Sequence, residues 1–395
     1  MHNNSIKNLL QLEGFIIKNV NHLTKTVKIH IELPVIEHEC PKCKTKTTKI
    51  HDYYSQPITD IPIHNKPTKL IYRKRRYKCP NCKKSFFENN SIVNKFARKT
   101  RRLSEFIIDQ LRNLQSISTI SKNTGVNASF ILRLLPYLAV SNNKLPEVLC
   151  IDEFKGNAGN FKYQVALIDG KTHTVIDILE CRNKHFLCDY FKKYPKSELD
   201  KVKYFVTDLW ETYKDISFTY FRKAKIIADH FHFARYVCNA VNKIRIEVQK
   251  KLPSDERKYF KHSRKLLLSR NYKLKEKQNE ELSYILTNYS EALRGAYIEK
   301  ENLLDILHSS DNSNIKINKF TAWIDRNLTS DILELRECAK TYYNWYVEIK
   351  NSLEVPYSNG ATEGFNNKIK VLKRVCFGFR NFTNFKARIL LLNRG

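Results

Sequence analysis

Two pairs of closely spaced cysteines constrain the fold of this 395-residue chain more than any other feature. Residues 40–43 read CPKC and residues 79–82 read CPNC. A two-residue spacer lets both thiolates of a pair bind one tetrahedral zinc ion, and two pairs complete its coordination. The alternative is two unrelated redox-active or buried pairs, but doubled motifs of this kind are typical of zinc sites. We therefore predict a structural Zn²⁺ held by four thiolates, those of Cys40, Cys43, Cys79 and Cys82.

The charge of the chain indicates the class of its partner. Lys and Arg number 70 against 40 Asp and Glu, which gives a formal net charge of +30. Such an excess favours a polyanion, because each neutralised phosphate releases counterions. An acidic membrane is the competing partner, but no apolar run approaches the ~20 residues that span a bilayer. Since the N-terminus lacks the pattern of a secretory signal, we expect a cytoplasmic, DNA-associated protein with no membrane partner and with reduced cysteines.

The N-terminal third has the pattern of two DNA-binding modules. We expect a zinc-ribbon domain over residues 1–94, in which KLIYRKRRYK (69–78) alternates like an exposed basic strand. Arg73, Arg75 and Arg76 of this strand are candidate DNA contacts. Residues 95–145 predict a helix-turn-helix. An RNA-binding protein is a weaker alternative, because no RNP or KH signature occurs.

The run ISTISKNTGVNASFILRLL (117–135) predicts the two helices of that motif, joined at Gly125. Asn127 is a candidate N-cap of the second helix. Apolar side chains at helical spacing would pack the helices together, namely Ile117, Ile120, Val126, Ile131 and Leu134. The second helix would then present Asn127, Ser129 and Arg133 to a major groove. An ordinary αα-hairpin is the alternative, and the net charge favours DNA binding.

The rest of the chain predicts an α/β core interrupted by helices. Residues 146–233 contain five short β-rich runs, with a helical pattern at 183–194 between the third and fourth. The runs are EVLCIDEF, KYQVALID, TVIDILE, KVKYFVTD and KAKIIAD. Residues 234–352 read as charged, Leu- and Tyr-rich helices, and residues 353–395 close the chain with further helical patterns.

Three acidic residues lie where such a core builds sites. Asp152 and Asp208 each lie at or just past the end of a β run, at the edge of a sheet. Glu363 lies in the first turn of the helix predicted by SNGATEGFNNKIKVLKR (358–374), which Ser358 or Asn359 would cap. Two Asp and one Glu can hold two Mg²⁺ or Mn²⁺ ions about 4 Å apart and activate water against a phosphodiester. For each carboxylate alone, a solvated charge is the alternative.

The predicted Glu363 helix has two faces. An apolar face recurs at spacings of 4, 3 and 4 residues, formed by Phe365, Ile369, Leu372 and Cys376. A polar stripe repeats these spacings two residues earlier, formed by Glu363, Asn367, Lys370 and Arg374. Two residues turn a helix by about 200°, so the stripes lie opposite each other. We expect the carboxylate to reach a metal while the cations follow a DNA backbone.

The run ADHFHFARYV (228–237) adds an auxiliary pair. Asp229 ends the fifth β run, and His232 follows three residues later on the same helix face. The alternative is an N-capping Asp and a partly buried His without a functional role.

Together these motifs resemble the ISL3 family of bacterial insertion-sequence transposases. The resemblance rests on the doubled cysteine motif, the helix-turn-helix pattern, IDEFKG, TDLW with ADHFHFARY, and the closing SNGATEGFNNKIKVLKR segment. It implies an RNase H-like core of the DDE type, which uses divalent metal to cut and join DNA. It further implies that Asp152, Asp208 and Glu363 are the catalytic acids and that Asp229 and His232 form an auxiliary D-x-x-H feature. The 155 residues between the second and third acids then imply a helical insertion.

We therefore expect a multidomain α+β protein. Its parts are a zinc ribbon (1–94), a helix-turn-helix (95–145), an RNase H-like core (146–233 and 353–395) and an all-helical insertion (234–352). Its partners would be double-stranded terminal inverted repeats and target DNA, bound by a homodimer because two element ends must be joined. The alternative function is a sequence-specific DNA-binding regulator with an inactive core. The three retained acids disfavour it, since a decayed core has no reason to keep them.

Overall fold

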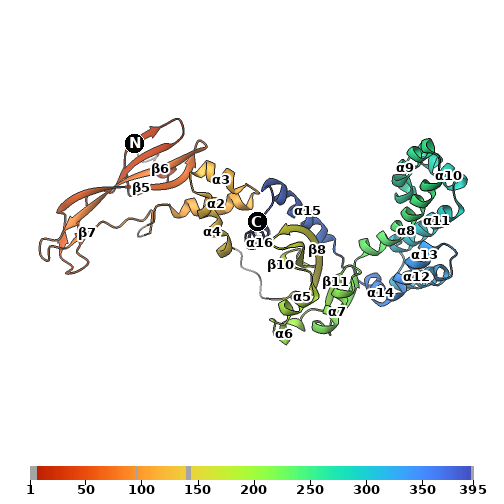
Figure 1. The fold of residues 1–395 in the computed structure, drawn as a ribbon. Coiled ribbons are helices and arrows are strands. Elements are labelled where there is room, and N and C mark those ends of the chain that lie inside the picture. Colours follow the sequence, from red (N-terminus) through yellow and green to blue (C-terminus); the bar gives the residue numbers. More distant parts are fainter. Residues whose placement is uncertain (1–6, 95–96, 139–143, 393–395) are drawn as a thin grey trace. The chain divides into compact units, whose positions relative to one another are not determined.

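The computed structural model describes residues 7–94, 97–138 and 144–392 (Figure 1). The chain divides into two compact units, residues 1–140 with 371–395, and residues 141–370. Within the described ranges, no helix has the length and apolar character needed to cross a membrane.

A five-stranded sheet forms the N-terminal part of the first unit. The order is β1-β2-β6-β5, with β7 paired to β6. The strands are β1 (Ile16–His22), β2 (Val27–Glu32), β5 (Ile50–Ile63), β6 (Lys66–Lys78) and β7 (Ser85–Phe87), and β3 (His38–Glu39) pairs separately with β4 (Lys46–Thr47). An apolar cluster covers one face of the sheet and includes Phe15, Val27, Ile29, Leu70 and Tyr72. The sheet therefore has a buried face and a solvated face.

The basic strand β6 lies inside this sheet and is not an exposed edge. It pairs with β2, β5 and β7. Its buried positions fall at Leu70 and Tyr72 and then shift register to Arg75. Arg75 is 3 % exposed, and its guanidinium donates to Leu33 O at 2.6 Å and to the buried Glu88 carboxylate at 3.4 Å. The prediction that Arg75 faces DNA is wrong, because this side chain forms a buried ion pair.

Three helices follow the sheet, α2 (Arg101–Arg112), α3 (Ile117–Thr124) and α4 (Ala128–Leu138). α3 ends at Gly125, whose φ of 67° is the left-handed conformation that favours glycine after a helix. Asn127 Oδ1 accepts a hydrogen bond from Ser129 N at 2.8 Å, so the predicted N-cap of α4 is confirmed. Two short helices joined by a tight turn are thus present at the predicted residues.

The core of these helices differs from the prediction in two respects. Ile120, Val126 and Ile131 are buried as expected, but α4 buries Leu135 in place of Leu134. In addition, α16 (Phe382–Leu392) supplies Ala387 and Leu391 to the same cluster. The predicted domain over 353–395 is therefore divided, because the apolar face left open by α2–α4 is covered by the last helix of the chain.

The second unit contains all five predicted β runs and the predicted helix between them. The strands are β8 (Val148–Ala158), β9 (Phe161–Asp169), β10 (Val175–Leu179), β11 (Tyr204–Thr207) and β12 (Lys225–Ala228). Their order is β10-β9-β8-β11-β12, antiparallel from β10 to β8 and parallel from β8 to β12. Three helices accompany them, α5 (Lys184–Phe191), α6 (Lys196–Leu199) and α7 (Glu211–Tyr220). Leu149, Leu167, Phe191 and Phe205 lie in the shared core.

The predicted helical insertion begins directly after β12. It comprises α8 (His230–Lys251), α9 (Ser254–Leu268), η1 (Asn271–Lys273), α10 (Glu276–Asn288), α11 (Glu291–His308), α12 (Ser313–Leu328), α13 (Leu333–Asn344) and α14 (Tyr346–Glu354). These helices share one apolar core around Phe260, Trp323 and Tyr342. We call them the helical lobe.

The helix α15 (Gly360–Val375) carries the predicted third acid. Phe365, Ile369 and Leu372 are buried, as their spacing predicted. The residues of the predicted polar stripe are all exposed, namely Glu363, Asn367, Lys370 and Arg374. Cys376 is half-buried just past the helix end. The two-faced helix inferred from the sequence is therefore confirmed.

Candidate active site

The four predicted zinc ligands lie together in the first unit. Their sulfur atoms are all within 4.8 Å of one another, with Cys40 Sγ and Cys43 Sγ each 3.5 Å from a sulfur of the other pair. Zn–S bonds of about 2.3 Å in a tetrahedron require S···S distances near 3.8 Å, so the donor set fits zinc. The two pairs lie in separate turns of the same kind. Cys40 N donates to Thr45 O and Cys79 N donates to Lys84 O, both at 3.0 Å.

The predicted catalytic acids line one cavity of about 630 Å³ in the second unit. Asp152, Asp208 and Glu363 all reach it, although they are up to 211 positions apart in the sequence. Asp229 and His232 reach it as well, together with Asn359, Asn366, Arg235 and Lys370. The cavity therefore gathers all five acidic or auxiliary candidates.

The register of three parallel strands places the Asp residues. Val206 of β11 lies opposite Cys150 of β8, so Asp152 and Asp208, each two residues later, lie level with each other. Thr207 lies opposite Ala228 of β12, so Asp208 and Asp229 are level as well. Asp208 and Asp229 directly follow the ends of β11 and β12, whereas β8 continues to Ala158, so Asp152 lies within its strand and not at the predicted end.

Asp208, Asp229 and His232 form the tightest group. One donor atom from each lies within 4.8 Å of the other two, and His232 Nδ1 is 2.7 Å from Asp208 Oδ2. Burial lowers the pKa of His232, but the hydrogen bond to Asp208 and the charge of that carboxylate outweigh burial and leave the pKa raised. Asp229 precedes α8 without making a side-chain cap bond. The Asp229 side chain therefore does not cap α8, contrary to the alternative interpretation.

Asp152 is the most deeply buried acid of the catalytic set. Burial, and next the charge of Asp208, raise its pKa to about 7. Its Oδ2 accepts a hydrogen bond from Asn366 Nδ2 on α15 at 2.9 Å. The negative charges of Asp152 and Asp208 repel each other, and a bound metal ion would offset this repulsion.

Asn359 forms hydrogen bonds to groups on or next to all three parallel strands, a role that the sequence did not reveal. Its Nδ2 donates to Ile151 O and to Asp208 Oδ1, both at 3.3 Å, and its backbone N donates to Asp229 Oδ1 at 2.9 Å. The sequence suggested Ser358 or Asn359 as a helix cap. Ser358 Oγ accepts from Gly360 N at 3.3 Å, whereas the Asn359 side chain is directed to the carboxylates. In the sequence, only the position of Asn359 four residues before Glu363 pointed to a role at this site.

Glu363 lines the cavity but is exposed, and it does not belong to the tight Asp208 group. Lys370 lines the same cavity, two stripe positions further along α15. Asn367 is exposed between them and accepts a hydrogen bond from Lys370 Nζ at 3.1 Å. The carboxylate and the nearest cation of the predicted stripe thus face one site.

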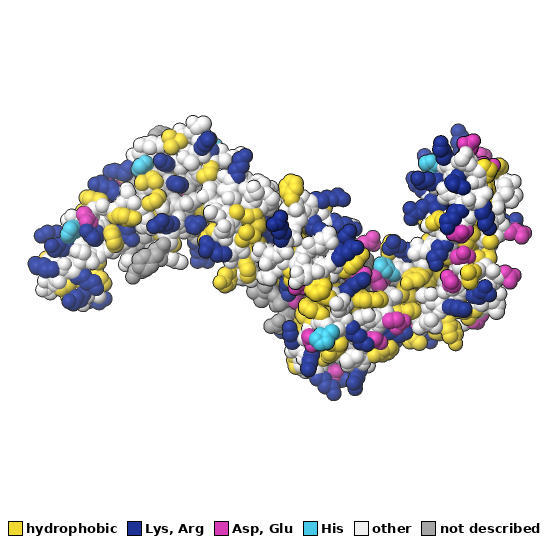
Figure 2. All heavy atoms as spheres, in the orientation of Figure 1, with side chains coloured by type: hydrophobic (Ala, Val, Ile, Leu, Met, Phe, Trp, Pro, Cys, Tyr) yellow, Lys and Arg dark blue, Asp and Glu magenta, His cyan; other side chains and the backbone are white. Residues whose placement is uncertain are grey.

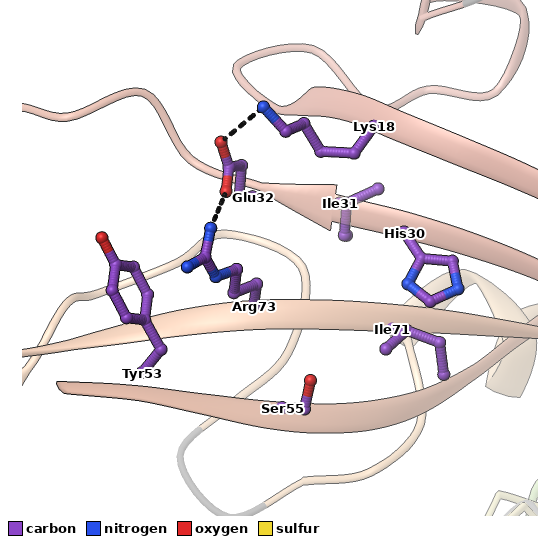
Figure 3. A pocket seen from close by; sticks show the side chains of 8 residues that line it. All are labelled: Lys18, His30, Ile31, Glu32, Tyr53, Ser55, Ile71 and Arg73. Carbon is purple, nitrogen blue, oxygen red and sulfur yellow. Dashed lines mark ion pairs between the residues drawn. The ribbon is translucent and has the colours of Figure 1, made fainter.

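One candidate DNA contact of β6, Arg73, lines a smaller cavity of about 400 Å³ in the first unit (Figure 3). Glu32 bridges Lys18 at 3.3 Å and Arg73 at 3.5 Å there. The Arg73 guanidinium also lies 3.8 Å from the centre of the Tyr53 ring. Arg76 forms an ion pair with Asp52. Both arginines reach the surface, but each already has a carboxylate partner.

Comparison with known proteins agrees with this architecture. The model of the ISL3 transposase family matches residues 149–389, and that of the zinc finger of the transposases of IS204, IS1001, IS1096 and IS1165 matches residues 36–82. The transposase for insertion sequence element IS1001 from Bordetella parapertussis is 22% identical over 373 residues, covering 92% of this chain and 91% of that protein. A Lactococcus lactis protein named ATP-dependent protease is 52% identical over 52 residues, which is 13% of this chain and 17% of that one. The catalytic-family match covers more than half of the chain, and the chain belongs to the ISL3 family of transposases.

Proposed function

We propose that the cavity of the second unit is where this transposase cuts and joins DNA strands, with Asp152, Asp208 and Glu363 as its catalytic acids. The observation that carries the proposal is the convergence of three Asp residues, level with one another on neighbouring parallel strands, and a helical Glu on one cavity. Three antiparallel strands followed by two parallel ones, with the acids on the first and fourth in sequence, are what we expect of an RNase H-like core. The helical lobe is then the insertion between the second and third acids.

The donor set suits two Mg²⁺ or Mn²⁺ ions. Such ions prefer carboxylate and amide oxygens, and the cavity offers both. Asn359 Oδ1 and Asn366 Oδ1 are buried and have no hydrogen-bond partner in the described part of the chain. The ions would supply a water activated for attack on phosphorus and would stabilise the attacking and leaving oxygens. Asp208 is held by His232 and Asn359, and Asp152 is held by Asn366, so these side chains orient the acids.

The test of this proposal is strand nicking on a labelled terminal repeat. Purified protein is expected to nick the repeat with Mg²⁺ or Mn²⁺ and to be inactive with EDTA. Binding to the repeat without nicking under any metal would instead support the regulator with an inactive core.

Replacing Asn359 by Ala is expected to raise the Mg²⁺ concentration needed for half-maximal nicking, because Asp208 Oδ1 loses the Nδ2 donor that holds it, whereas the backbone N–H that binds Asp229 remains. The free energy of unfolding should also fall by about 1–3 kcal/mol, since buried acceptors lose a hydrogen bond. Asn351 is the matched control, because its Nδ2 donates to Ile226 O at 2.9 Å outside the cavity. Asn351→Ala should lower stability without changing the Mg²⁺ dependence. An equal Mg²⁺ dependence in both variants would contradict the positioning role.

We further propose that α3 and α4 form a helix-turn-helix that reads the terminal repeat. Ser129 and Arg133 are exposed on α4, as major-groove contacts must be. Asn127 is exposed but its Oδ1 caps the helix, which leaves its amide nitrogen for DNA. Arg73 and Arg76 of the zinc ribbon, and Asn367, Lys370 and Arg374 of α15, would contact the phosphate backbone.

Arg133→Ala in the full chain is expected to reduce the preference for terminal-repeat over random DNA by about tenfold or more, since a good base contact discriminates by about 1–3 kcal/mol. Arg112, exposed at the end of α2, is the control of equal charge. Arg112→Ala should weaken binding to both DNAs equally, if at all. Competition binding at fixed salt measures the ratio of repeat to random affinity for both variants. An unchanged preference in Arg133→Ala would mean that another element reads the repeat.

The proposed homodimer follows from the reaction, because two element ends must be held together. The sequence YYNWYVEIKNSL (342–353) is a candidate surface for pairing, with an internal core helix as the alternative. Tyr342, Trp345 and Ile349 belong to the core of the lobe, and among the large hydrophobic side chains of the segment only Tyr343 and Val347 are exposed. Light scattering with and without terminal-repeat DNA tests the dimer, and an active monomer in both states would exclude it.

A further inference from the structure

The helical lobe carries a division of charge that the catalytic proposal does not use. Residues 243–277, from the second half of α8 to the start of α10, contain 13 Lys and Arg against 4 Asp and Glu. Residues 278–354 contain 8 Lys and Arg against 13 Asp and Glu. In Figure 2, Lys and Arg side chains gather over α8 and α9 at the left of this lobe, and Asp and Glu side chains over α10 and α11 at its right. The lobe therefore has a basic side and an acidic side.

One arginine distinguishes the basic side from an ordinary solvated surface. Arg245 of α8 is 6 % exposed, and its guanidinium donates to two neutral oxygens, Asn242 Oδ1 at 3.0 Å and Gln249 Oε1 at 2.7 Å. Burial, and next the positive charge of Arg264 on α9, lower its pKa. A nearly buried cation beside a second cation is costly unless an anion neutralises it. The described residues supply no carboxylate ion pair to either arginine.

The cations of α9 are exposed around this point. Lys258, Lys261, Arg264 and Lys265 are all exposed. None of the four has an ion-pair partner within the described ranges 7–94, 97–138 and 144–392. Lys261 and Arg264 are three residues apart and share a helix face. A row of unpaired cations therefore borders the Arg245 position.

Several carboxylates of the acidic side of the lobe, unlike the cations of α9, have ion-pair partners within the chain. Glu299 pairs with Arg326 at 2.8 Å, Asp311 with Lys319 at 2.6 Å, and Glu348 with Lys214 at 3.0 Å. Glu301 pairs with the buried Lys300 at 2.7 Å. These carboxylates are not available to neutralise the α9 row of a second copy. The net charge of +30 and the position of α8 at the catalytic cavity favour a polyanion, rather than a second copy, as the partner of this row.

The helix α8 connects the basic side to the catalytic cavity. Arg235 is exposed and lines the cavity, and Arg245 follows ten residues later, with Asn242 on the same stripe of the helix. At 1.5 Å per residue the two arginines are about 15 Å apart along the axis. That is the length of four to five phosphates along a DNA strand, at about 3.4 Å each.

We propose that Arg245, Lys258, Lys261, Arg264 and Lys265 form a surface that binds the phosphate backbone of double-stranded DNA beside the cleavage site, without reading its sequence. We call it the α8–α9 surface. The proposal rests on the proposed function in taking DNA as the partner of the cavity. It adds that the helical lobe holds the duplex several nucleotides away from the cut phosphate.

The test replaces Lys261, Arg264 and Lys265 by Gln in the full chain and measures affinity for a random-sequence duplex over a range of salt concentrations. The slope of log affinity against log salt should become shallower by about 2–3, because each phosphate contact contributes about 0.9. The matched control replaces Lys192, Lys193 and Lys196, three exposed lysines from the end of α5 to the first residue of α6, by Gln. The control slope should stay close to that of the wild type. Thermal unfolding of both variants verifies that they fold.

Two results would overturn the proposal. One is a slope unchanged by the α9 substitutions, or reduced as much by the control substitutions. The other is a change in light-scattering mass caused by the α9 substitutions without a change in slope, which would make the surface a contact between copies. Wild-type nicking with Mg²⁺ is measured in parallel. If the wild type nicks DNA but the α9 substitutions leave the salt slope unchanged, only the α8–α9 surface is refuted. If the wild type does not nick DNA, the catalytic proposal is refuted.

Discussion

Glu363→Gln lowers the rate of terminal-repeat nicking by about three orders of magnitude, on our expectation. Glutamine keeps the shape of the side chain and removes the charge that binds the metal, so several kcal/mol of transition-state stabilisation are lost. Affinity for the repeat should hold or rise slightly, because a negative charge near the phosphates has gone. Asp152→Asn and Asp208→Asn should have the same effect. Nicking of a labelled repeat with Mg²⁺ or Mn²⁺, with binding measured separately, checks both parts.

The control for Glu363 is Glu291, which is also exposed in the first turn of a helix, α11. Glu291→Gln should nick as fast as the wild type. Glu153 is a poorer control, because it lines the cavity and forms an ion pair with Arg182. Full activity of Glu363→Gln, combined with inactive Asp229→Asn and His232→Ala, would assign the metal to the tight Asp208 group instead.

Replacing all four of Cys40, Cys43, Cys79 and Cys82 by Ser is expected to remove the bound zinc and terminal-repeat binding together. Structural zinc contributes roughly 10–16 kcal/mol in small zinc-binding domains, which exceeds what the turn between β3 and β4 and the turn between β6 and β7 can replace. Metal analysis of the purified full chain should give one zinc per wild-type chain and none for the variant. Competition binding with repeat and random DNA measures the loss.

Cys188 and Cys238 provide the control for this experiment. Both are half-buried thiols that lie outside the four-sulfur cluster. Their joint replacement by Ser should leave one zinc per chain and normal binding to the repeat. Zinc retained by the variant that lacks all four clustered cysteines would refute the ribbon site.

The parts of the fold that could be predicted are those fixed by local pattern. The five β runs are short and apolar between polar turns, and each became a strand. The two stripes of α15 follow from the helical period, and both have the expected burial. The cysteine spacing fixes its own geometry, which needs no knowledge of the surrounding fold.

The parts that failed depend on partners distant in sequence. Arg75 is buried because the pattern of β6 shifts register where β7 and Glu88 replace β2 as its neighbours, which alternation within β6 cannot reveal. Asn359 donates to Ile151 O, 208 positions away, so its role appears only once the strand ends meet. Leu134 and Leu135 are both apolar, and the packing of α16 on α4 accompanies burial of the second. Each of these wrong or absent predictions concerns the packing partner of a residue, whereas the helix or strand that carries the residue was predicted.

The packing of α16 against α2 and α4 has a consequence for how the protein matures. Ala387 and Leu391 complete a cluster that begins with Leu103, so the helices proposed to read the repeat are left with an uncovered apolar face until the end of the chain has been synthesised. A polypeptide released early would lack both Glu363 and this cover. Such a product would lack the third acid and would hold the reading helices less firmly, which limits its ability to occupy repeats and block the full-length enzyme. If α3 and α4 read the repeat as proposed, occupation of DNA ends should therefore favour chains that include α16.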